Sequence, residues 1–116
     1  MKRTLGVAGL TAVLSLAALA VAPSASASTA DRNACLSGFN VCVWQNTNWG
    51  GNRFAANSSW TGNCANSLTL GHSVANGGPR SVRFYSADGC TGSYFDIRAD
   101  DYSASTPFAV HSFKRL

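Results

Sequence analysis

The sequence predicts an all-β fold in which one domain of two Greek-key motifs is packed as a sandwich and held by two disulfides. Three observations predict it. Beyond residue 27 the chain is rich in aromatic residues, glycine and asparagine and poor in helix formers, a composition typical of strands and turns. The same part of the chain contains an internal repeat, in which the pattern that starts at Val41 starts again at Val82. It also contains all four cysteines.

Residues 1–27 have the layout of a secretory signal peptide. Two basic residues precede an apolar run from Leu5 to Ala22, and Ala25 and Ala27 form an A-x-A cleavage site. Cleavage there would leave residues 28–116 as a single exported domain. The alternative is a membrane anchor, because the run approaches the roughly 20 residues that a spanning helix needs. Pro23 and the lack of a following basic cluster favour the signal peptide.

The exported part carries little net charge. Two of the nine Lys and Arg residues lie in the leader, so seven remain against five Asp, which gives a net charge of +2. The exported part also has no cluster of Lys or Arg. The low net charge and the lack of a basic cluster argue against nucleic acid as a partner. No basic amphipathic helix is present that would bind a membrane.

Four cysteines in a short exported domain predict a disulfide framework. Three pairings are open, and we favour Cys35 with Cys42 and Cys64 with Cys90. The stretch "LSGFNV" between the first two contains a glycine that lets the chain turn back on itself. A zinc site is disfavoured, because there is no C-x-x-C spacing and no paired histidine nearby.

The repeat predicts two hairpins. Sliding the sequence along itself lays Val41–Phe54 on Val82–Phe95, and the matched positions are apolar, aromatic or glycine. Each copy begins with alternating residues, passes through a turn cluster and continues into a second apolar strand. Gly51 and Gly92 lie where each hairpin bends back, a place where positive φ or close packing would exclude a side chain.

A serine begins an apolar and basic stretch later in each copy. These stretches are "SVRF" from Ser81 and "SFKRL" from Ser112. Neither connection shows helical periodicity. Hairpin, connection and return strand, repeated twice, predict a first Greek key over about 41–81 and a second over about 82–116.

These residues form a spaced pattern of aromatic, four residues, aromatic, one residue and Gly, followed later by Ser. The pattern resembles the βγ-crystallin Greek-key signature. The first key reads Trp44, Trp49, Gly51 and Ser81, and the second reads Tyr85, Cys90, Gly92 and Ser112, with Cys90 in place of the second aromatic. The resemblance implies a folded-over hairpin at each glycine, with an aromatic ring on it and the serine hydroxyl bonded to its backbone.

The stretch "CLSGFNVCVWQNTNWGG", from Cys35 to Gly51, carries a narrower resemblance. Placed after a leader, it is similar to the secreted bacterial peptidase inhibitors whose founding member inhibits metalloproteinases. This resemblance implies a secreted, monomeric inhibitor that occludes the groove of an extracellular protease. Killer-toxin-like antimicrobial proteins share the fold and give one alternative, and a structural crystallin module without calcium gives another.

Calcium binding is the first function that a crystallin-like fold suggests, through a loop of the form N/D-N/D-x-x-S/T-S. The corresponding stretches are "NGGPRS", Asn76 to Ser81, and "PFAVHS", Pro107 to Ser112. Gly77 lacks a carboxylate, Arg80 places a cation where a hydroxyl ligand is needed, and the second stretch has no leading acid. We therefore expect no metal and no cofactor.

Catalytic residues are not expected either. The chain has two histidines, His72 and His111, but no nucleophile elbow and no glutamate, and its cysteines are assigned to disulfides. The adjacent Asp100 and Asp101 fit a solvated loop better than an acid/base pair. We expect a protein that is not an enzyme.

Surface recognition is the remaining function, and two segments are candidates for contact with a protease. One is the "SGF" loop between Cys35 and Cys42, and the other is "NSSWTGN" from Asn57 to Asn63. Within the second, Ser58, Ser59, Trp60 and Thr61 are the contact candidates. Trp60 is either an exposed anchor of the kind found at interface hot spots or a core residue.

Overall fold

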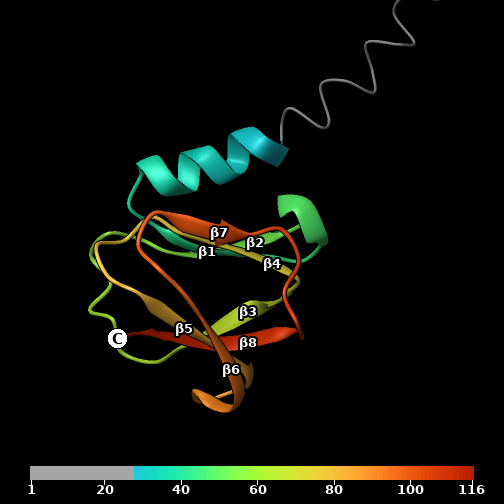
Figure 1. Ribbon diagram of the computed structural model, residues 1–116, viewed down its shortest axis with the longest axis vertical. Helices are drawn as coiled ribbons and strands as arrows, with labels where there is room; N and C mark the ends of the chain where they lie inside the picture. The colour runs from blue at the N-terminus through green and yellow to red at the C-terminus, as the bar shows by residue number, and fades with distance from the viewer. Residues whose placement is uncertain (1–27) are drawn as a thin grey trace, which may run out of the picture.

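A computed structural model describes residues 28–116, so the predicted leader and its cleavage site lie outside the described residues. The described chain forms two four-stranded antiparallel sheets that face each other (Figure 1). One sheet has the order β2-β1-β4-β7 and the other β3-β8-β5-β6. The bounds are β1 Val41–Trp44, η1 Thr47–Trp49, β2 Arg53–Ala56, β3 Ala65–Gly71, β4 Ser73–Asn76, β5 Val82–Ala87, β6 Thr91–Ile97, β7 Asp101–Ser103 and β8 Val110–Arg115.

Each sheet takes three strands from one half of the sequence and one from the other. Strands β1, β2 and β4 are joined by β7, and β5, β6 and β8 are joined by β3. This exchange of one strand interlocks two Greek keys, and it confirms the predicted two-key sandwich. The equivalence of β1 with β5 and of β2 with β6 is the one that the internal repeat predicts.

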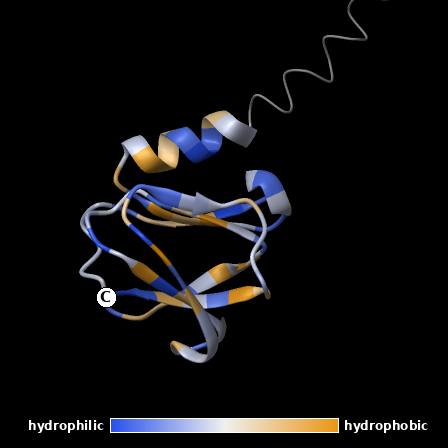
Figure 2. Ribbon diagram, in the orientation of Figure 1, coloured by the Kyte–Doolittle hydropathy of each residue, from blue (hydrophilic) through white to orange (hydrophobic). Residues whose placement is uncertain are grey.

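The core between the sheets comes from the inward residues of both keys. Its fully buried members are Val41, Val43, Val74, Val82, Phe84, Val110 and Phe113. Phe113 lies 5.6 Å from Phe84 and 6.2 Å from Phe54, measured between ring centroids, so aromatic contacts join the two halves. Figure 2 shows hydrophobic stretches in strands of both layers.

A helix over residues 28–37 was not expected from the sequence. It lies across the outer face of the first sheet, on the side away from the second sheet (Figure 1). Cys35 of this helix packs against the outward side chains Trp44 and Ala75 in a second buried cluster. The guanidinium of Arg32 lies 4.6 Å from the ring of Trp49, a cation–π contact that adds to the docking. Strand β1 is therefore buried on both faces.

The two hairpins fold over as the glycines predict. Gly51 and Gly92 both have positive φ, at 76° and 88°. A Cβ on Gly92 would lie 2.5 Å from Ser86 Oγ, and one on Gly51 would lie 2.8 Å from Asn46 Nδ2. Both positions therefore exclude a side chain, as expected.

The serine of the first key is Ser73 and not Ser81, so that part of the prediction is wrong. Ser73 Oγ donates to Asn46 O at 2.6 Å and accepts from Trp49 N at 2.9 Å. Ser112 makes the equivalent bonds in the second key, to Ala87 O and from Cys90 N. Ser81 is half-buried and lies beyond the end of β4, in the connection that leads to β5.

The disulfides join Cys35 to Cys42 and Cys64 to Cys90, the pairs favoured from the sequence. The first ties the N-terminal helix to β1, and the second ties the start of β3 to the hairpin between β5 and β6. The first disulfide is fully buried and fixes the helix on β1, whereas the second links two loops at the surface.

Candidate functional site

The segment from Asn57 to Asn63 does not present Trp60 as a free anchor. The indole is half-buried, its centroid is 5.2 Å from that of Phe113, and its Nε1 donates to Asn63 O at 3.0 Å. The guanidinium of Arg115 lies 4.9 Å from the same ring. Trp60 therefore packs at one end of the core. It is a core residue and not the exposed anchor that was its other interpretation.

The neighbours of Trp60 remain exposed. Ser58, Ser59 and Thr61 all lie at the surface. Asn57 Oδ1 accepts from both the backbone N and the Oγ of Ser59, so the turn is held by its own polar groups. It presents small polar side chains with little apolar area for a partner.

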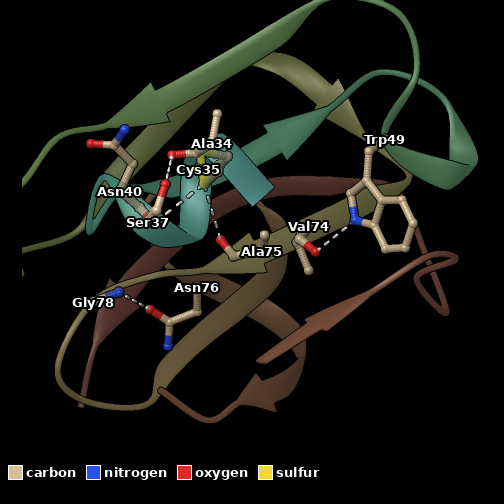
Figure 3. The surroundings of a disulfide bond; sticks show 10 residues. Ala34, Cys35, Ser37, Asn40, Trp49, Val74, Ala75, Asn76 and Gly78 are labelled. Carbon is tan, nitrogen blue, oxygen red and sulfur yellow. Dashed lines mark hydrogen bonds between the residues drawn. A yellow bond between two sulfur atoms is a disulfide. The ribbon is translucent and has the colours of Figure 1, made fainter. Parts of the chain in front are cut away.

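The loop inside the Cys35–Cys42 disulfide, here called the clasp, has one exposed aromatic residue. The helix ends in a Schellman arrangement, in which Asn40 N donates to Cys35 O and Phe39 N donates to Leu36 O. Phe39 takes the left-handed conformation, φ 59°, that glycine usually provides there, and its side chain is 62% exposed. The disulfide surroundings in Figure 3 show Ala34, Cys35, Ser37 and Asn40 gathered around this turn.

A second exposed apolar site lies on β3, and the sequence analysis did not identify it. The pairs Asn66 with Ser112 and Gly71 with Val110 are in register, so four residues of β3, Ser67–Leu70, stand opposite the single residue His111 of β8. We call these four residues the bulge. Bulges of this kind bend an edge strand outward and redirect its side chains.

The burial pattern in the bulge is the reverse of that in an ordinary amphipathic strand, in which apolar side chains are buried and polar ones are exposed. Ser67 and Thr69 are half-buried, whereas Leu68 is 88% exposed and Leu70 is 48% exposed. Burying a leucine stabilises a fold by about 1.5–3 kcal/mol. Because Leu68 is exposed, the fold lacks most of this stabilisation at that position. Because Leu68 and Leu70 are exposed on one ordered segment, the bulge is a candidate surface for contact with a partner.

Three features brace the bulge. Cys64, just before β3, is bonded to Cys90. Asn66 Oδ1 accepts from Gly89 N at 2.8 Å, which ties the strand to the tip of the β5–β6 hairpin. Within the bulge, Ser67 Oγ accepts from Thr69 N at 3.2 Å and donates to Thr69 O at 2.5 Å. The loop is therefore fixed before any partner binds.

Because the key serine is Ser73, the residues that align with the crystallin calcium-loop pattern change and now overlap the bulge. Counting back from Ser73, the six positions of N/D-N/D-x-x-S/T-S read "LTLGHS", Leu68 to Ser73. Leu68 replaces the first oxygen ligand, and His72 stands where a hydroxyl ligand is needed. These residues do not fit a calcium ion, which requires several hard oxygen ligands. Among residues 28–116, no group of three or more metal-ligating side chains forms.

The histidines and the ion pair of the described residues make structural contacts. Nδ1 of His72 lies 2.7 Å from Gln45 O, and Nδ1 of His111 lies 3.1 Å from Ala109 O, so both rings are engaged with backbone carbonyls. Arg83 and Asp96 form a two-bond surface pair, and the hydrogen bonds from Arg83 lower the pKa of the Asp96 carboxyl. This pair is structural, since it links β5 to β6.

None of the helices among the described residues is long and apolar enough to cross a membrane.

The chain is similar to known proteins in sequence and in structure. Residues 28–97 match the family model of peptidase inhibitor family I36. The chain is similar to the crystal structure of a βγ-crystallin from an archaeon, with 25% identity and a TM-score of 0.52, over 66% of this chain and 96% of that one. It is also similar to IPSE/alpha-1 from Schistosoma mansoni eggs, with 15% identity and a TM-score of 0.49, over 67% of this chain and 84% of that one. No curated protein matches the chain.

Proposed function

Because this chain belongs to peptidase inhibitor family I36, we propose that it inhibits an extracellular metalloproteinase by occluding the substrate groove. Membership makes it a peptidase inhibitor, with a protease as its partner, and not an enzyme. The metalloproteinase class is the finer part of the proposal. It is supported by the resemblance of the stretch from Cys35 to Gly51 to the inhibitors whose founding member acts on metalloproteinases.

One observation carries the occlusion mechanism: exposed large apolar side chains lie on segments that the disulfides fasten. Phe39 lies inside the clasp, and Leu68 lies shortly after Cys64 on a braced strand. A protease groove binds a chain segment that offers apolar side chains in a fixed geometry. Since the disulfides order these segments in advance, little conformational entropy is lost on binding, and more of the contact energy appears as affinity.

Location and assembly complete the proposal. We propose that the leader is cleaved after Ala27 and that residues 28–116 are exported as a single domain; the two disulfides support this proposal, because they fit an oxidising environment outside the cell. We propose a monomer that binds neither nucleic acid nor membranes, in line with its low net charge.

The test expresses the full chain with its leader and collects the protein from the culture medium. The purified protein is titrated against secreted metalloproteinases and serine proteases with a small fluorogenic peptide as substrate. The proposal predicts saturable inhibition of at least one metalloproteinase, competitive with the peptide. Unchanged turnover of every protease at inhibitor concentrations far above the enzyme would contradict it, and inhibition of serine proteases alone would contradict the class.

A further inference from the structure

We propose that the bulge Ser67–Leu70 is the inhibitory element and that Leu68 is the side chain that fills an apolar specificity pocket of the protease. This inference rests on the proposed function and names the surface that performs it. Leu68 is the most exposed large hydrophobic residue among the described residues, at 88%, and its neighbour Leu70 adds a second apolar contact on the same side of the strand.

The shape of the bulge suits a groove. Four residues project from the sheet opposite one residue of β8, and β3 is the edge strand of its sheet, so no further strand covers that side. Ser67 to Leu70 have no ladder partner on β8, so the outer edge of β3 offers a partner those backbone groups that are not bonded within the bulge, as Thr69 N and O are to Ser67 Oγ.

The surrounding sequence suits the centre of an interface. From Phe54 to Pro79 the chain contains no Asp, Glu, Lys or Arg. Cores of protein interfaces are depleted of charged residues, because a buried charge must lose its hydration. A leucine on a braced protrusion within an uncharged segment therefore fits an apolar pocket, and the protease groove is the occupant that the family assigns.

Phe39 is the competing anchor, and two observations favour Leu68. The exposed fraction of Phe39 is smaller, 62% against 88%. The left-handed backbone of Phe39 belongs to the cap of the helix over residues 28–37, and its neighbours Leu36 and Cys35 point into the buried cluster under that helix. It therefore offers one isolated ring, whereas the bulge offers two leucines and a free strand edge.

The test measures the inhibition constant of three variants, Leu68→Ser, Phe39→Gly and Tyr94→Ser, against a protease that the wild-type protein inhibits. Tyr94 is the matched control, because it is 54% exposed on β6, at the opposite edge of the same sheet. We expect Leu68→Ser to weaken inhibition about 30-fold or more, the effect typical of a hot-spot residue. Tyr94→Ser should stay within about threefold of wild type, Phe39→Gly should weaken inhibition less than Leu68→Ser does, and all three variants should keep cooperative melting.

A measurement on the wild-type protein guards against a variant that fails to fold. Amide hydrogen exchange of residues 65–71 should slow markedly when the protease is added, while exchange in β6 stays unchanged. Full inhibition by a folded Leu68→Ser variant, or unaltered exchange at 65–71 in the complex, would overturn the inference and leave the proposed function standing. Failure of the wild-type protein to inhibit any protease would overturn both.

Discussion

Replacing Ser73 by alanine should destabilise the fold strongly. Its hydroxyl is fully buried and makes two hydrogen bonds, to Asn46 O at 2.6 Å and from Trp49 N at 2.9 Å. Each buried group left without a partner costs about 1–3 kcal/mol. Asn46 itself is exposed, so water recovers part of that loss at its carbonyl. We expect a loss of about 2–4 kcal/mol, which lowers the melting temperature by roughly 10–20 °C in a domain of this size.

Thermal unfolding followed by circular dichroism tests this value, with two comparison variants. Ser112→Ala removes the equivalent bonds of the second key and should cost a similar amount. Ser81→Ala, at a half-buried position outside both hairpins, should change stability by less than about 0.5 kcal/mol. A larger loss with Ser81→Ala than with Ser73→Ala would refute the assignment of the serine.

Two further predictions concern the surface. Phe39→Gly should leave the melting temperature unchanged or raise it, since glycine adopts the left-handed conformation at φ 59° without the roughly 1 kcal/mol penalty of a side chain; a fall of more than a few degrees would contradict this. Arg83 lowers the pKa of Asp96, so the pair stabilises the fold above the unfolded pKa of about 3.9 and loses that contribution as the pH falls through the folded value. Denaturant unfolding of wild type and Asp96→Asn should therefore show a small difference at pH 7 that shrinks as the pH falls below about 3.9, and a difference that grows on acidification would contradict it.

The fold was predictable because the repeat reports positions that the backbone needs twice. Gly51 and Gly92 exclude side chains, and the alternation in β1 and β5 places valine and phenylalanine in the core. Trp49 and Cys90 differ in chemistry, yet both have φ 57° and both donate their backbone N–H to the key serine. The repeat therefore reported backbone conformation more faithfully than side-chain identity.

The serine of the first key was missed because the spacing between hairpin and serine differs between the keys. The alignment that matches Val41 with Val82 places Ser73 against Lys114, whereas the serine of the second key, Ser112, comes earlier in the chain. The signal that could have found Ser73 is the dipeptide His-Ser, which precedes an apolar residue in both keys as His72-Ser73 and His111-Ser112.

The N-terminal helix and the bulge could not be predicted from local pattern. The helix over residues 28–37 is polar, and its position depends on the cation–π contact of Arg32 and on the disulfide of Cys35, both tertiary. Alternating leucines at Leu68 and Leu70 would ordinarily indicate a buried face. Their exposure follows from the register with β8, which the sequence of β3 does not contain.

The most direct test of the account is a titration of the secreted protein against a metalloproteinase, with a fluorogenic peptide as substrate and mass spectrometry of the inhibitor afterwards. Occlusion by a rigid, disulfide-braced surface predicts tight competitive inhibition at a one-to-one ratio. It also predicts that the disulfide-bonded inhibitor is recovered intact. Peptide turnover that stays unchanged at a large excess of the protein, or loss of inhibition as the protein is progressively cleaved, would contradict it.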